Sequence, residues 1–308
     1  MRQTATVKTF VALAVSALVS GSSEPAHARG FVIKRVIKRV VKAKAVRAAL
    51  LGKKKPSHQL ALHSRRAVGW GSGESQTYDV RIAGIEAARA ALSVGKPKRT
   101  RGRWTIALRA IGETVPFISA LYKMSEHSVT LASLEGLRPL RTKEHRVMRK
   151  KLRKMSTRHG ALNLQVIERN NRRIERRKRR FRGPHFDSVT ALYVLRSLPL
   201  RQGKKLRMLV LAGTALYDVR LTVRKKERVR SKLGANLCHR IDGSARRILD
   251  DGRVYPRKPL RRFSLWLTAD RARVPIKAKG DTDIGYVEAA ISSHQPPKRR
   301  LALRAPRL

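Results

Sequence analysis

Cysteine is nearly absent from this sequence, because Cys238 is the single one among 308 residues. An intramolecular disulfide is therefore impossible, and a metal site built from several cysteines is excluded. Acidic residues are also scarce: 20 Asp and Glu stand against 72 Lys and Arg, which leaves a formal net charge of +52. Such a charge favours polyanionic partners and says nothing about the fold.

Local catalytic motifs are missing as well. The chain has no G-x-S-x-G, no G-x-x-x-x-G-K-[ST], no H-E-x-x-H and no C-x-x-C. His58 and His63 are near each other in sequence, but their region has no regular period, which favours surface residues over metal ligands. Cys238 lies in "GANLCHRI", where a small buried side chain is the preferred interpretation. A reactive thiol is the alternative, because neighbouring His239 and Arg240 could lower its pKa. We expect no enzyme, no cofactor and no metal site.

The apolar stretch at the N-terminus is too short to span a membrane. "TFVALAVSALVSG" has thirteen residues, whereas a spanning helix needs roughly twenty. Arg2 and Lys8 precede it, and "SSEPAHA" follows it with an A-x-A cleavage pattern, so residues 1–28 are predicted to be a secretory signal peptide. An uncleaved anchor or a buried helix is the alternative. We expect a mature chain that begins at Arg29 in the periplasm or outside the cell.

Residues 29–56 form a basic segment with an amphipathic pattern. On a helical wheel, Val32, Ile33, Val36, Ile37, Val40 and Val41 share one half, and Lys34, Arg35, Lys38, Arg39 and Lys42 share the other. Such a helix can lie in a membrane interface among anionic headgroups. A solvated basic linker with chance periodicity is the alternative. Nucleic acid is disfavoured as its partner, since no base-stacking aromatic residues are interleaved.

Residues 57–75 read as a Gly-Ser-rich linker, and period-two alternation begins after it. The pattern predicts a hairpin over 78–94 and further strands at 104–110, 217–223, 263–268, 273–279 and 284–292. Asp187 is a predicted N-cap for one short helix, and 141–155 fits either a helix or strands. We expect an all-β fold, an antiparallel, strongly curved sheet or open barrel, over residues 76–294, followed by a basic tail (295–308).

The strand segments also resemble a known family. "YDVRIAGIEAARAALSV", "DSVTALYVLRSLPL", "QGKKLRMLVLAGTALYDVRLTV", "LGANLCHRI" and "FSLWLTADRARVPIKAKGDTDIGYVEAAIS" follow the order found in exported bacterial proteins grouped as domain of unknown function 3108. The resemblance implies an all-β periplasmic domain of Gram-negative bacteria with no established activity, and it favours strand for 141–155. The sequence departs from the family in its basic density, notably in "RNNRRIERRKRRFRG" (169–183).

These patterns together predict a protein that is peripheral to a membrane of the cell envelope. Anionic lipid or another envelope polyanion is the expected partner, and an apolar ligand inside a barrel is conceivable by analogy of architecture. Lipopolysaccharide, acidic polysaccharide or nucleic acid bound by the whole basic surface is the alternative. The candidate anion-binding residues outside the arm are Arg176, Arg177, Lys178, Arg179 and Arg180.

Overall fold

The computed structural model describes residues 67–149, 151–160, 163–170, 173–180, 184–256, 258–282 and 285–303. Strands dominate this part of the chain, and two short helices, α3 (Pro116–Tyr122) and α4 (Ser188–Ser197), accompany them. The all-β prediction is confirmed, with one helix more than the sequence predicted. No helix in these ranges is long and apolar enough to cross a bilayer. The predicted signal peptide and amphipathic helix fall outside the described residues.

Sixteen strands of the described chain form one sheet, which is antiparallel along its path except for the last pair, β11 and β12. From one edge to the other, the strands are β10 (Arg173–Arg180), β9 (Asn163–Asn170), β8 (Lys151–His159), β7 (Pro139–Met148), β6 (Met124–Ser133), β5 (Arg103–Thr114), β3 (Ile85–Val94), β2 (Ser75–Ile82), β17 (Gly285–Gln295), β16 (Pro275–Thr282), β15 (Arg261–Thr268), β14 (Gly234–Ile248), β13 (Ala215–Ser231), β12 (Lys205–Ala212) and β11 (Phe186–Asp187). β4 (Lys98–Thr100) pairs with β5 off this path. A separate two-stranded sheet joins β1 (Ala67–Ser72) to β18 (Arg299–Ala302).

Period-two alternation accounts for the strands that the sequence predicted. In β13, Val219 and Leu221 are buried while Arg220 between them is exposed, since successive side chains of a strand point to opposite faces. The predicted hairpin is confirmed as β2 and β3. Within the ambiguous segment 141–155, residues 141–148 belong to strand β7 and residues 151–155 to strand β8, and not to a helix.

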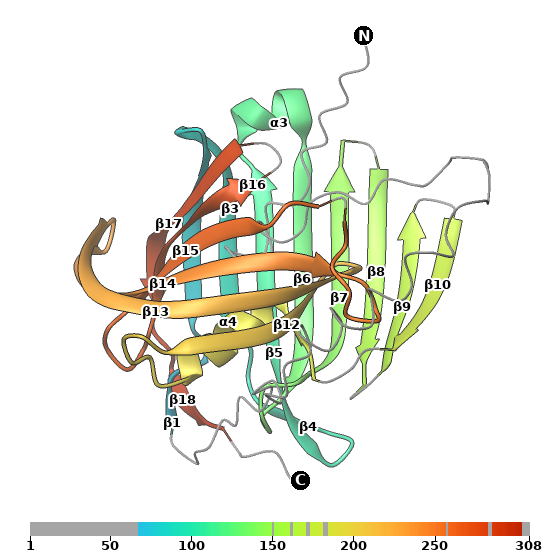
Figure 1. The fold of residues 1–308 in the computed structure, drawn as a ribbon, viewed down its shortest axis with the longest axis horizontal. Coiled ribbons are helices and arrows are strands. Elements are labelled where there is room, and N and C mark those ends of the chain that lie inside the picture. Colours follow the sequence, from blue (N-terminus) through green and yellow to red (C-terminus); the bar gives the residue numbers. More distant parts are fainter. Residues whose placement is uncertain are drawn as a thin grey trace, which may run out of the picture.

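The sheet rolls up and overlaps itself instead of closing edge to edge. β12 is buried on both faces: Met208 and Val210 point into the main core, whereas Leu209 and Leu211 pack with Met155 of β8. The β11–β12 edge therefore lies inside β7 and β8, and β11 contacts β7. Beyond this overlap, β9 and β10 continue the sheet outward, on the right of Figure 1.

Helix α4 fills the interior of the roll. It begins at the predicted cap, where Asp187 Oδ1 accepts a hydrogen bond from the Thr190 backbone N–H at 2.7 Å. In return, the Thr190 hydroxyl oxygen accepts one from the Asp187 backbone N–H at 3.0 Å. This reciprocal capping box satisfies two backbone donors. Nine of its ten residues are buried, and it contacts β12 on one side and β5 and β6 on another (Figure 1).

Two predicted domain boundaries require correction. β1 lies within the predicted linker (57–75), and β18 lies within the predicted tail (295–308). The glycines of β1 serve close packing instead of flexibility, because a Cβ at Gly69 would meet the Arg271 carbonyl oxygen at 1.9 Å. Trp70 beside it is fully buried and donates to the Ser197 hydroxyl at 3.0 Å, which ties β1 to the end of α4.

Candidate functional site

The outer side of strands β7 to β10 carries exposed basic side chains in register with one another. Thr142 of β7 and Thr157 of β8 are opposite each other and buried, so their neighbours along each strand point outward. The pairing then places basic residues of adjacent strands side by side. We call the exposed set the cationic face: Arg141, Lys143, Lys154, Arg158, Arg169, Arg176 and Lys178.

No acidic residue shares the cationic face. The outward register positions of β6 to β10 that the structure describes hold neither Asp nor Glu. On the opposite half of the sheet, by contrast, Asp218 pairs with Arg207 at 2.7 Å and with Arg220 at 3.3 Å, and Asp242 accepts from Arg224 at 2.9 Å. At the described outward positions of β7 to β10, the positive charges are therefore not offset by a carboxylate on the same face.

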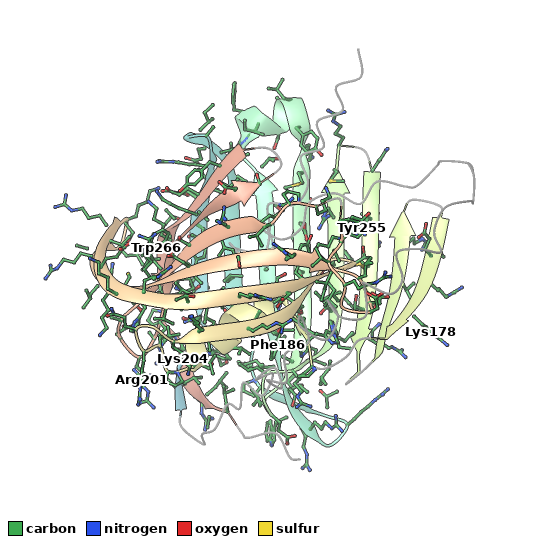
Figure 2. The ribbon with its side chains drawn as sticks, in the orientation of Figure 1. Lys178, Phe186, Arg201, Lys204, Tyr255 and Trp266 are labelled. Atoms are coloured by element: carbon green, nitrogen blue, oxygen red, sulfur yellow. The ribbon has the colours of Figure 1, made fainter. Side chains whose placement is uncertain are left out.

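Two isoleucines interrupt the cationic face. Ile167 of β9 is 46% exposed and lies opposite Arg176, and Ile174 of β10 is 49% exposed and lies opposite Arg169. Apolar side chains framed by cations match the boundary between acyl chains and headgroups better than they match water. Figure 2 shows Lys178 near the outer edge of this half of the sheet.

The structure separates the five basic residues that were predicted as one anion-binding run. Arg176, Arg177, Lys178, Arg179 and Arg180 all lie in β10. Successive positions of a strand belong to opposite faces, so the register positions of Arg177 and Arg179 belong to the face opposite the cationic face. A run read along the sequence therefore overstates the charge on either side.

The basic residues of β7 and β8 were not among the predicted anion-binding residues. Arg141, Lys143, Lys154 and Arg158 alternate with Thr142 and other inward residues, a signal that becomes readable once 141–148 and 151–158 are assigned to strands. The predicted arm residues (Lys34, Arg35, Val36, Ile37, Lys38, Arg39, Val40 and Lys42), like His58 and His63, lie outside the described residues.

Beneath the cationic face, a chain of buried hydrogen bonds joins the sheet to α4. The Asp187 carboxylate, besides capping α4, accepts hydrogen bonds from the hydroxyls of Thr130 and Thr142, the latter at 2.8 Å. Thr142 Oγ1 lies 2.9 Å from His159 Nε2, and His159 Nδ1 lies 3.0 Å from His185 Nε2. Four strands and the start of the helix are thus held by one polar cluster.

Burial controls the charge of this cluster. It lowers the pKa of His185 to about 4, with a further contribution from His159, and it also lowers the pKa of His159. Both imidazoles are therefore neutral near pH 7. Asp187, Thr142 and His185 are each at most 4% exposed, so these three polar groups are shielded from solvent, and their hydrogen bonds join the sheet to α4.

A second charged group lies farther along the same inner face. Arg146 Nε and Nη2 donate to the two carboxylate oxygens of Glu126 at 2.7 and 2.9 Å. Burial and, second to it, the Glu126 carboxylate raise the pKa of nearby Glu144 to about 7. Among the described residues, no three His, Cys, Asp or Glu side chains are placed to hold a metal ion.

Cys238 is buried, as the preferred interpretation of the sequence predicted. It lies in β14 with its side chain buried, and burial raises the pKa of its thiol to about 11. A thiol with so high a pKa is almost wholly protonated at neutral pH and is a poor nucleophile.

Comparisons with solved structures find distant relatives of the fold. A beta-barrel-like protein of domain of unknown function DUF1849 from Brucella abortus shares 10% identity at a TM-score of 0.49, over 75% of this chain and 100% of that chain. A protein named as exported, with a YmcC-like fold, from Bacteroides fragilis shares 9% identity at a TM-score of 0.32, over 75% and 100% of the two chains. A protein named as a lipoprotein from Parabacteroides distasonis shares 7% at 0.34, over 74% and 99%. These likenesses are too distant to carry a function.

The family comparison is more informative. No curated protein matches the chain. The model of the family described as Protein of unknown function (DUF3108) matches residues 77–292, which confirms the family that the sequence segments resemble. The match runs from β2 to β17 and so includes the cationic face, the buried cluster and α4. This chain belongs to the family Protein of unknown function (DUF3108).

Proposed function

We propose that this chain is a non-enzymatic protein of the Gram-negative cell envelope that binds anionic lipid headgroups through the cationic face. One observation carries the proposal: basic side chains of four adjacent strands share a face whose described positions hold no carboxylate. Each such cation gains about 1 kcal/mol beside an anionic membrane. The predicted signal peptide supports a location where this face meets lipid phosphate instead of a chromosome.

Exposed isoleucines favour a membrane over a soluble polyanion. Ile167 and Ile174 gain nothing from a hydrated polysaccharide chain, but they gain from the acyl boundary of a bilayer. The alternative partner is lipopolysaccharide, acidic polysaccharide or nucleic acid, drawn to the total charge. Nucleic acid has the least support, since the described outward positions of β7 to β10 hold no Phe, Tyr or Trp for bases to stack on.

An apolar cargo has less support than surface binding. The interior of the roll holds α4, and the buried side chains of the helix and the sheet form one continuous core cluster. A ligand inside would have to compete with this packing, whereas the cationic face needs no rearrangement to bind.

A vesicle-binding experiment tests the proposal. The mature chain from Arg29 onward is mixed with vesicles of phosphatidylglycerol and phosphatidylcholine, or of phosphatidylcholine alone, and bound protein is measured by co-sedimentation. We expect binding to the anionic vesicles alone, weakened at least tenfold at high salt because counterions screen the contacts. A variant without residues 29–56 then separates the contribution of the predicted arm from that of the cationic face.

A pair of charge variants locates the binding surface. The first replaces Lys143, Lys154, Arg158 and Arg176 with Gln, and the matched control replaces Arg207, Arg220, Arg224 and Arg246 on the opposite half of the sheet. Both lose four positive charges, so a general attraction weakens equally in both. We expect the first variant to lose at least tenfold in affinity and the control to stay within about threefold. Equal losses, or binding to soluble polyanions without binding to vesicles, would support the alternative.

A further inference from the structure

Several connections at one end of the roll lie side by side. The Ala83 N–H, in the turn between β2 and β3, donates to the Tyr286 carbonyl beside the turn between β16 and β17 at 3.0 Å. The Val115 N–H, just before α3, donates to the Ala87 carbonyl at 3.1 Å. The Arg149 N–H, after β7, donates to a carbonyl at the end of α3, that of Lys123, at 2.7 Å. We call this continuous edge the α3 rim, at the top of Figure 1.

Large apolar side chains project from the α3 rim. No residue of α3 is buried, and its Phe117 and Leu121 are 75% and 76% exposed. These two are four residues apart and so share one face of the helix. Ile85, after the neighbouring turn, is 62% exposed, and Tyr286 is 46% exposed. Exposed apolar groups scattered singly are ordinary, but four on adjoining connections mark an interaction surface.

Cations surround these apolar groups. Arg81, Lys123, Arg149 and Lys151 are all exposed along the rim, and the Arg149 guanidinium lies over the Tyr122 ring, 5.1 Å from its centroid. The carboxylates here are fewer: Glu86 pairs with Arg89 at 3.6 Å, Glu113 lies 3.4 Å from His127, and Asp281 is near the end of β16. The rim therefore presents apolar tips within a net positive border.

We propose that the α3 rim is the edge that enters an anionic bilayer, with Phe117 and Leu121 in the acyl region and the rim cations at the level of the phosphates. The inference rests on the proposed function and names its point of insertion. Charge decides between occupants, because a second copy of this chain would bring two basic rims together, while an anionic bilayer complements both the border and the tips. Tyr286 has the amphipathic ring that is enriched at such interfaces.

A fluorescent probe on the rim tests insertion. Leu121→Cys, labelled with nitrobenzoxadiazole in the mature chain, is compared with Leu237→Cys, which is 49% exposed on β14; Cys238 is buried and is left in place. With phosphatidylglycerol vesicles we expect a blue shift and at least a twofold rise in emission from the probe at residue 121. We expect no change at residue 237. Vesicle binding without a change at residue 121 would overturn the inference and leave the proposed function standing.

A pair of double variants tests the contribution to binding. Phe117→Ser with Leu121→Ser removes the two exposed tips, and Leu233→Ser with Leu237→Ser removes two exposed leucines at the hairpin of β13 and β14. Since all four side chains are exposed, circular dichroism should show both variants folded. We expect the partitioning of the rim variant onto anionic vesicles to fall at least tenfold, and that of the control variant to stay unchanged. Unchanged partitioning, or an oligomer of the native chain that the rim variant dissociates, contradicts insertion; a native chain that binds no anionic vesicle defeats the proposed function itself.

Discussion

Arg196 of α4 and Glu74 form a two-pronged ion pair in the interior, with Nη2 to Oε1 at 2.7 Å and Nη1 to Oε2 at 3.1 Å. Neither side chain has any exposed surface. Arg196 also donates to the carbonyls of Ala272 and Arg273, and Gln76 donates to Glu74 at 3.0 Å. The pair joins the interior helix to the sheet and to the connection between β15 and β16. Burial alone would raise the pKa of Glu74, but hydrogen bonds from His294 and Arg196 lower it below its ordinary value.

Breaking this pair should destabilise the protein strongly. Arg196→Met leaves a buried carboxylate without its countercharge, which typically costs about 3–5 kcal/mol of unfolding free energy. The matched control is Arg224→Met, which removes a half-exposed partner of Asp242 and should cost at most about 1 kcal/mol. Urea unfolding at pH 7 measures both. Equal losses in the two variants would show that the buried pair contributes no more than a surface pair.

Acid should weaken the protein through the buried histidines. The pKa of His185 is lowered to about 4 from an ordinary 6.5, so between these values the unfolded chain binds more protons than the native one. Stability is therefore lost as pH falls from about 6.5 to 4. His185→Gln should reduce the dependence of the unfolding free energy on pH in this window, by up to about 3 kcal/mol between pH 6.5 and pH 4. Thermal unfolding at several pH values measures the slope, and an unchanged slope contradicts the assignment.

Glu144 should act in the opposite direction. Its pKa is raised to about 7 from 4.5 by burial and by Glu126, so the native chain retains a proton that the unfolded chain loses. Stability falls as pH rises through this window. Glu144→Gln removes this pH dependence. The difference in unfolding free energy between the variant and the native chain should therefore be more favourable to the variant at pH 8 than at pH 5, by about 1–3 kcal/mol. A variant that is equally affected at both pH values would count against the raised pKa.

The glycines of β1 offer a test of close packing. Gly69→Ala places a Cβ against the backbone of Arg271, and the backbone must move to admit it. We expect about 1–3 kcal/mol of destabilisation and faster amide exchange in β1 and β18. Gly95→Ala is the control, because its nearest contacts are at 3.3 Å and require a shift of only a few tenths of an ångström. Hydrogen exchange read by mass spectrometry measures the exchange rates of the peptides that contain β1 and β18.

Cys238 should be inert until the protein unfolds. Burial keeps its thiol protonated, with a pKa of about 11, so native protein should react with iodoacetamide at least a hundredfold more slowly than protein in urea. Mass spectrometry counts the labelled fraction over time. Rapid labelling of the folded protein would instead support the alternative interpretation, in which His239 and Arg240 make Cys238 a reactive thiol.

Local patterns determined much of the fold. Tyr217, Val219 and Leu221 alternate with polar residues, so the strand and its buried face are both readable from the sequence. Asp187 is an N-cap wherever a helix follows, because its carboxylate bonds the backbone three residues on. The basic composition likewise pointed to anionic partners without any knowledge of the fold.

Non-local pairing decided the rest. The sequence did not predict β1, because its glycines resemble a linker although they admit the Arg271 backbone. It did not predict α3 either, because Phe117 and Leu121 are 75% and 76% exposed and give no buried face to recognise. The cationic face depends on register: a shift of one residue would turn Arg141 inward and Thr142 outward. Only the rolled sheet brings His159, His185 and Asp187 into one buried cluster. Charge and alternation are properties of the chain, whereas the face on which a charge lies follows from which strands become neighbours.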